Sequence, residues 1–139
     1  MLIIQHSIRT KATPESIWAL WSDIKTWNTW DHGIEGGEIQ GDFVEGAKGW
    51  LKTKGGPKVK FQILRAEKNK VFHDRSALPL TSLDFIHTLE RNGDYTIVTQ
   101  RVEMTGLLTF IFAKVIGSGI KKDMPSVMAK LVEMAEKKS

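Results

Sequence analysis

The sequence of 139 residues predicts an α+β fold in which one curved sheet wraps a long C-terminal helix. Residues 107–138 carry apolar side chains every three to four positions, which is the period of a helix with one buried face. The residues before 106 instead form short segments typical of strands. A continuous helix over 107–138 would be about 45 Å long at 1.5 Å per residue. Only a sheet built from the preceding strands offers enough apolar surface to bury such a helix.

The N-terminal third predicts a strand followed by two short helices. Residues 2–11 alternate weakly between apolar and polar side chains, as a strand does. Thr13 and Pro14 then suit the cap and the first position of a helix over residues 14–22. Asp23 is expected to cap a second short helical turn that ends near Trp30.

Six further strands are expected between residues 35 and 104. The glycine-rich stretch 33–50 lacks the lysine and hydroxyl residues of a phosphate-binding loop, and it fits strands joined by tight turns instead. Asn92-Gly93 is a strong hairpin signal and separates the clearest pair of strands. The expected strands are 35–41, 47–54, 58–66, 70–77, 81–91 and 94–104.

Composition and charge narrow the functional classes. The net charge of +4 comes from scattered lysines, which argues against a nucleic-acid footprint. No cysteine is present, and the most apolar stretch is shorter than the roughly 20 residues that a bilayer span needs. The four histidines lack the spacing of metal ligands. We therefore expect a cytoplasmic single domain over residues 1–139, monomeric or homodimeric, with no cofactor, metal, nucleic acid or stable membrane insertion.

The hairpin register predicts polar groups on an apolar face. A loop of Asn92-Gly93 would pair Arg91 with Asp94 and make His87 and Gln100 diagonal neighbours. A two-residue turn at Lys68-Asn69 would place Asp74 on the face of Phe61, Ile63 and Phe72. His87 and Gln100 are expected either to satisfy each other within a packed core or to line a cavity. The face would carry Leu83, Phe85, His87, Leu89, Val98, Val102 and Met104.

Two further features favour a cavity beneath the helix. Gly117-Ser118-Gly119 and Pro125 interrupt the helix where a core would need volume, so residues 117–125 are expected to form the mouth of a pocket. Close approach of the helix to the sheet is the other explanation for these glycines. Four of the five tryptophans lie at positions 18, 21, 27 and 30. They are expected to pack the helical elbow against the sheet, with Trp30 as the candidate to face the cavity.

The chain resembles the START-like helix-grip (SRPBCC) superfamily, which includes polyketide cyclase/dehydrase-like and lipid-transfer domains. The resemblance begins in the stretch Ala12-Thr13-Pro14-Glu15-Ser16-Ile17-Trp18, followed by Asp23, Trp27 and Trp30. It continues at residues 85–90 and 104–107. It implies a seven-stranded curved antiparallel sheet gripping the C-terminal helix, two short helices between strands 1 and 2, and a hydrophobic pocket. Fold alone does not define activity.

Three functions remain open from the sequence. The first is binding of a small hydrophobic or aromatic ligand between the sheet and the C-terminal helix. The second is a cyclase/dehydrase-like enzyme that uses His87 or Asp74 as acid or base. The third is a protein-interaction or chaperone-activator-like domain. The candidate ligand-binding residues are Trp30, Trp50, Phe61, Phe85, His87, Gln100, Phe112, Ile116 and Ile120.

Overall fold

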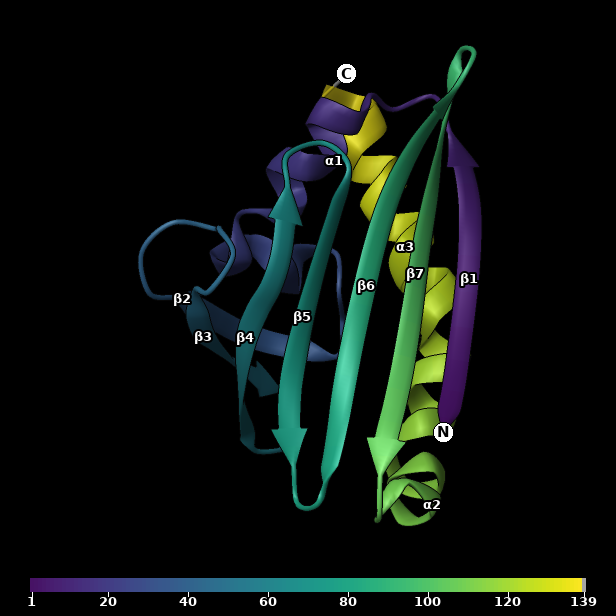
Figure 1. Ribbon diagram of the computed structural model, residues 1–139. Coiled ribbons are helices and arrows are strands. Elements are labelled where there is room, and N and C mark those ends of the chain that lie inside the picture. The colour runs from purple at the N-terminus through teal and green to yellow at the C-terminus, as the bar shows by residue number, and fades with distance from the viewer. Residues whose placement is uncertain (139) are drawn as a thin grey trace.

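The computed structural model describes residues 1–138 and contains one sheet of seven antiparallel strands. Their order across the sheet is β1-β7-β6-β5-β4-β3-β2, so only the β1–β7 pair joins strands that are not consecutive. The sheet curves around the C-terminal helix, which confirms the predicted fold class (Figure 1). The strands are β1 Leu2–Thr10, β2 Ile34–Ile39, β3 Lys48–Thr53, β4 Lys58–Glu67, β5 Val71–Leu78, β6 Thr81–Asn92 and β7 Tyr95–Gly106.

Two short helices separate β1 from β2, as the sequence predicts. The helix α1 spans Pro14–Trp21, and the Thr13 hydroxyl caps it by accepting a hydrogen bond from the backbone N–H of Ser16. A 3₁₀ helix, η1 (Ile24–Thr29), follows, although the Asp23 side chain makes no capping hydrogen bond. Together these helices close one end of the concave face.

The β6–β7 hairpin differs from the expected register by two residues. Asn92 pairs with Tyr95, so the loop is Gly93-Asp94 rather than Asn92-Gly93. Gly93 takes the positive φ of +62° that the turn requires. Because side chains alternate with a period of two, this shift moves no residue to the opposite face. It does make His87 and Gln100 direct cross-strand partners instead of diagonal ones.

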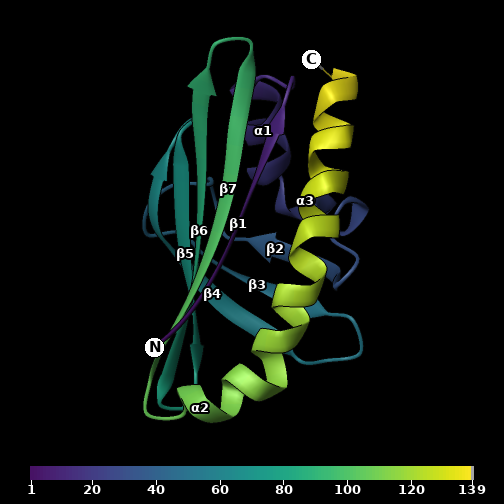
Figure 2. The same ribbon diagram turned by 90° about the vertical axis from the view of Figure 1, so that its right-hand side faces the viewer.

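The C-terminal segment is not one continuous helix over residues 107–138, and its break lies ahead of the interruption expected at residues 117–125. It consists of a short helix α2 (Thr109–Phe112), a π-helical turn η2 (Ala113–Gly117) and the long helix α3 (Ser118–Lys138). Figure 2 shows the bend between α2 and α3. Residues 107–116, which belong to the apolar repeat expected to be buried, include the exposed side chains Leu107, Phe110, Ile111 and Val115. The reason is geometric: β7 ends at Gly106, so these residues lie beyond the strands that could cover them.

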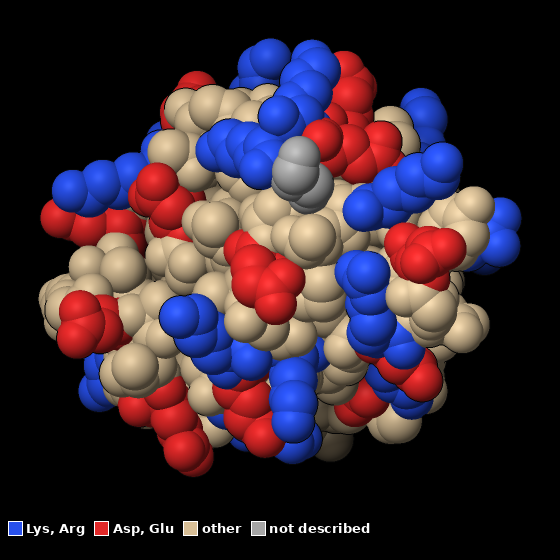
Figure 3. All heavy atoms as spheres, turned by 90° about the horizontal axis from the view of Figure 1, so that it is seen from above, with Lys and Arg blue, Asp and Glu red and all other residues tan. Residues whose placement is uncertain are grey.

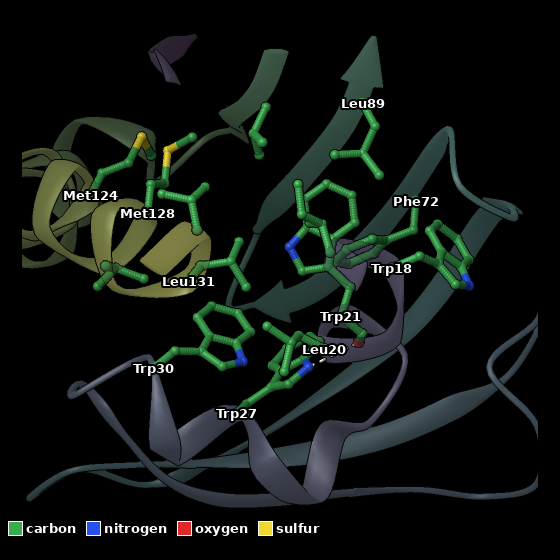
Figure 4. Packing of buried hydrophobic residues seen from close by; sticks show 14 of the residues in the cluster. Trp18, Leu20, Trp21, Trp27, Trp30, Phe72, Leu89, Met124, Met128 and Leu131 are labelled. Atoms are coloured by element: carbon green, nitrogen blue, oxygen red, sulfur yellow. Dashed lines mark hydrogen bonds between the residues drawn. The ribbon is translucent and has the colours of Figure 1, made fainter. Parts of the chain in front are cut away.

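The core lies between the sheet, the two N-terminal helices and the later part of α3. Phe72 of β5 is fully buried, and Trp21 contacts its ring edge-on at 5.2 Å between centroids. Figure 4 shows this aromatic cluster facing Met128 and Leu131 of α3. The buried face of α3 consists of Met124, Val127, Met128, Leu131, Val132 and Ala135.

Candidate functional site

The concave face of the two central strands is incompletely covered. Most of its side chains on β6 and β7 are buried, but Phe85 and Gln100 are partly exposed. These two residues are diagonal neighbours, because Phe85 pairs with Val102 and Gln100 with His87. The helix α3 packs against the edge strand β1 and against α1. The layer above the central strands therefore does not fully shield Phe85 and Gln100 from solvent.

An opening leads from the solvent into the space between β1 and the start of the C-terminal helix. It forms a groove of about 570 Å³. His6, one of its lining residues, pairs with Gln100 across β1 and β7. Gly117 is where the helix approaches β1 closely, since a Cβ there would lie 2.8 Å from Cδ2 of Leu2. The lining residues are Leu2, Ile3, Ile4, Gln5, His6, Ala113, Gly117, Ser118, Lys121, Met124 and Pro125.

His87 is buried on the concave face and held by aromatic rings. Its imidazole stacks on Phe72 with 3.9 Å between centroids and a 9° interplanar angle, and Trp21 contacts it edge-on. Burial lowers the pKa of His87 to about 3, although a hydrogen bond with the Phe72 backbone opposes the shift. The ring is therefore neutral at pH 7. Its Nδ1 atom has no hydrogen-bond partner within residues 1–138.

Asp74 is buried beside His87. It pairs with Ile63 on one side and Phe85 on the other, while Phe72 pairs with His87, so Asp74 and His87 are diagonal neighbours. Burial, followed by repulsion from Asp84, raises the pKa of Asp74 to about 8. The carboxyl is therefore mostly protonated at pH 7. In the described part of the chain, nothing hydrogen-bonds its Oδ1 atom.

Trp30 supplies a third unpaired polar group. Its side chain is buried at the end of η1, and its Nε1 finds no acceptor among the residues that the structure describes. Trp27 differs, because its Nε1 donates to the backbone oxygen of Trp21 at 2.9 Å. In Figure 4 the Trp30 indole lies next to Leu131 at the interior side of α3. A buried donor without a partner costs roughly 1–3 kcal/mol.

The other expected ligand-binding residues are not gathered in one place. Phe61 is buried on the concave face. Phe112 and Ile120 are partly buried against the core, whereas Ile116 is half-buried outside that cluster. None of the three helical residues lines the groove beside β1.

Trp50 requires a correction, because it does not line the interior. Gly49 pairs with Phe61 and Trp50 pairs with Lys60, so Trp50 lies on the outer face of the sheet. There Nζ of Lys58 lies 4.3 Å from the centroid of its ring.

The residues that the sequence analysis did not identify are Leu2, Ile4 and His6 of β1, which line the groove. The alternation of apolar and polar residues in β1 was the available signal, but nothing in the sequence indicated that this strand borders the groove.

The outer face beside the site holds a paired charge cluster. Asp84 accepts a hydrogen bond from Nε of Arg75 at 2.7 Å and lies 2.8 Å from Nε2 of His73. Burial acts to raise the pKa of Asp84, but the bonds to Arg75 and His73 outweigh it and lower that pKa. Within residues 1–138, no group of three or more histidine or carboxylate side chains is arranged to hold a metal ion.

The seven-stranded antiparallel sheet curved around a long C-terminal helix defines a helix-grip protein. Three solved structures share the arrangement along almost the whole chain. Norcoclaurine synthase from Thalictrum flavum is 17% identical with a TM-score of 0.74, covering 99% of this chain and 96% of its own. TTHA0849 from Thermus thermophilus is 13% identical with a TM-score of 0.75, covering 99% of both chains. The Aha1 dimer from Colwellia psychrerythraea is 22% identical with a TM-score of 0.72, covering 98% and 97%.

At these identities the structural likeness establishes the fold only. The sequence itself goes further, because residues 1–136 match the family model described as "Polyketide cyclase / dehydrase and lipid transport". The chain belongs to this family, which confirms the resemblance seen in the sequence. No curated protein sequence matches the chain. Within residues 1–138, no helix is both long and apolar enough to cross a bilayer.

Proposed function

We propose that the protein binds a small, uncharged, largely aromatic or apolar ligand between the sheet and α3. The observation that carries this proposal is three buried polar atoms without a hydrogen-bond partner among residues 1–138, in a largely apolar interior: Oδ1 of Asp74, Nδ1 of His87 and Nε1 of Trp30. Buried polar groups in proteins are normally hydrogen-bonded. A ligand with a few polar atoms would supply the missing partners.

The protonation states support an uncharged ligand. At pH 7 a carboxyl with a pKa of about 8 is mostly neutral, and an imidazole with a pKa of about 3 is neutral. Protonated Asp74 can donate and accept, His87 can accept at Nδ1, and Trp30 can donate. A hydroxyl or carbonyl group on an aromatic ring system matches these atoms without placing a charge in an apolar site.

Filling the opening is expected to abolish ligand uptake. Ala113 lines the groove and is half-buried, so Ala113→Trp would occupy part of its volume. Ala129 lies exposed on α3, and Ala129→Trp adds the same side chain without touching the groove. We expect wild type and Ala129→Trp to enhance the fluorescence of neutral naphthol and N-phenyl-naphthylamine probes, and Ala113→Trp to lose most of this binding.

Native mass spectrometry of the freshly purified protein provides the independent check. Wild type and Ala129→Trp are expected to carry the same bound small molecule, and Ala113→Trp to carry none. Equal uptake by all three proteins, with unchanged stability, would remove the groove as the route to the interior. Absence of any ligand or probe binding in the wild type would remove the proposal itself.

A second candidate function is acid–base catalysis on the bound ligand. The observation that favours it is Asp74, a buried carboxyl on the concave face whose pKa of about 8 makes it a proton donor close to neutral pH. His87 is the diagonal neighbour of Asp74, and Nδ1 of its neutral imidazole is a proton acceptor beside this donor. The ligand recovered from the protein distinguishes the two functions: a carrier returns it unchanged after incubation, whereas an enzyme with a cyclase/dehydrase-like activity returns it altered in mass or ring structure.

A further inference from the structure

Five apolar side chains gather at one end of the molecule and lie open to solvent. Phe110 is 68% exposed, Val115 is 72% exposed and Leu107 is 76% exposed, and Leu80 and Ile111 are exposed with them. The turn between β5 and β6 carries Leu80, and α2 with its flanking residues carries the other four. The backbone N–H of Leu107 donates to the oxygen of Leu80 at 2.9 Å, which joins the two segments. We name this set the apolar tip; Figures 1 and 2 show its two segments at the same end.

The backbone conformation of Leu80 also indicates that this end of the molecule contacts another surface. Its φ of +52° lies in the left-handed region, which glycine or asparagine usually occupies in turns. Asn69, the only other described residue besides glycines with a positive φ, follows that preference. A leucine in this conformation is strained, and here it buries little of its side chain. Strain and exposed apolar surface together mark sites that contact something else.

The segments that carry the apolar tip contain lysines and no acidic residue, and the nearest acidic residues in the sequence, Asp84, Glu103 and Asp123, lie just outside them. The three stretches that form this end are residues 1–8, 76–83 and 104–122, and they contain no aspartate or glutamate. The last of them contains Lys114, Lys121 and Lys122. The opposite end of the molecule differs, since Figure 3 shows acidic and basic side chains intermixed there. The apolar tip is thus a solvent-exposed apolar surface flanked by lysines.

We infer that the apolar tip docks onto the surface of an anionic lipid bilayer. Apolar side chains flanked by lysines are typical of segments that lie in a membrane interface, where the acyl region receives the former and anionic headgroups attract the latter. A second copy of the chain fits less well. A two-fold symmetric contact through the apolar tip would bring the same lysines of both copies together, and like charges across an interface oppose association.

The position of the apolar tip also places the groove beside the bilayer. Ala113, Gly117 and Lys121 line the groove and belong to the segment that continues from the tip. If the proposed ligand binding holds, docking would bring the opening toward the lipid from which an apolar ligand enters. The docking itself does not depend on that ligand.

Vesicle co-sedimentation tests the docking with the full chain. Wild type is expected to bind vesicles of phosphatidylcholine and phosphatidylglycerol, and to bind vesicles of phosphatidylcholine alone at least about tenfold more weakly. Phe110→Ser with Val115→Ser is expected to lower the partition coefficient about tenfold or more. Lys114→Glu with Lys122→Glu, at two exposed positions outside the groove lining, is expected to do the same and to remove the dependence on salt.

Two matched variants control for loss of apolar or basic residues elsewhere. Val44 is 54% exposed in the loop between β2 and β3, so Val44→Ser is the control for loss of an apolar side chain. Lys68 is exposed in the β4–β5 turn, so Lys68→Glu is the control for charge reversal. Both are expected to bind as wild type does. The tip residues are exposed, so their variants should keep the wild-type thermal midpoint, and the charge variant removes no apolar contact at all.

Three results would overturn the docking. The first is failure of wild type to bind anionic vesicles. The second is equal loss of binding in the controls and the tip variants. The third is a concentration-dependent dimer that Phe110→Ser with Val115→Ser dissociates while vesicle binding is absent, which would make the tip a contact between copies. Probe uptake by the tip variants reports on the interior separately, so a failed docking leaves the proposed ligand binding testable.

Discussion

Replacing Asp74 with asparagine is expected to stabilise the protein strongly at neutral pH and to change little at pH 4. The Asp74 carboxyl has an ordinary pKa of 3.8 in the unfolded chain and a pKa of about 8 in the fold. Between these values the folded state holds a proton that the unfolded state has released, so wild-type stability falls as pH rises, by about 1.4 kcal/mol per pH unit. An asparagine side chain does not titrate, so the gain from Asp74→Asn at pH 7 is on the order of 4 kcal/mol as an upper bound.

His87 provides the internal control for this experiment. The pKa of its imidazole is 6.5 in the unfolded chain and about 3 in the fold, so its contribution to stability weakens as pH falls below 6.5. From about pH 4 to 6.5 the two residues oppose each other, and wild-type stability should be nearly flat. Above 6.5 only Asp74 acts and stability should fall. Below about pH 4 only His87 acts and stability should fall again as the pH approaches 3.

Urea unfolding at a series of pH values measures these slopes. In Asp74→Asn the decline above pH 6.5 should disappear, and a decline below pH 6.5 should emerge because His87 is no longer opposed. In His87→Gln the stability should instead keep rising as the pH is lowered from about 8 to about 4. A wild-type profile that stays flat above pH 6.5 would show that the Asp74 carboxyl is already charged in the folded protein.

Trp21→Ala is expected to cost about 3–5 kcal/mol of unfolding free energy, the usual range for removing a large buried aromatic side chain. The Trp21 ring is almost fully buried and contacts Trp18, Phe72 and His87. Trp50→Ala is the matched control, because Trp50 is only partly buried on the outer face, where the Lys58 cation lies above its ring. That contact accounts for about 0.5–1 kcal/mol.

Chemical denaturation of the two tryptophan variants at one pH separates these values. If Trp21→Ala and Trp50→Ala lost similar amounts of unfolding free energy, the outer-face ring would contribute as much as the buried one, contrary to the burial described above. Trp21→Phe should recover part of the loss, since a smaller ring can still contact Phe72.

The β6–β7 hairpin shows why the sequence predicts faces better than contacts. The Asn-Gly signal located the hairpin, and alternation identified the apolar face. The loop nevertheless shifted by one residue in each strand to Gly93-Asp94, and the partner of His87 changed from Val98 to Gln100. Periodicity of two cannot detect such a shift, because every side chain stays on its face.

Two other errors have physical causes of the same kind. Gly49 flanks Trp50 in a strand with few apolar neighbours, so alternation could not assign the ring to a face. The apolar repeat of residues 107–116 shows which side chains align along a helix, but not where the sheet beneath it ends. The unpaired polar atoms of Asp74, His87 and Trp30 depend on the packing of several elements, so no local pattern reveals them.

The unequal distribution of the tryptophans gives the protein an intrinsic optical probe. Trp18, Trp21, Trp27 and Trp30 are buried, and Trp50 alone is on the outer face. Indole emission shifts to the red in polar surroundings, so a Trp50→Phe protein would emit almost entirely from the interior. Its spectrum would then respond to a molecule placed beside Trp30 without any attached dye, and titrations could follow occupancy of the interior directly.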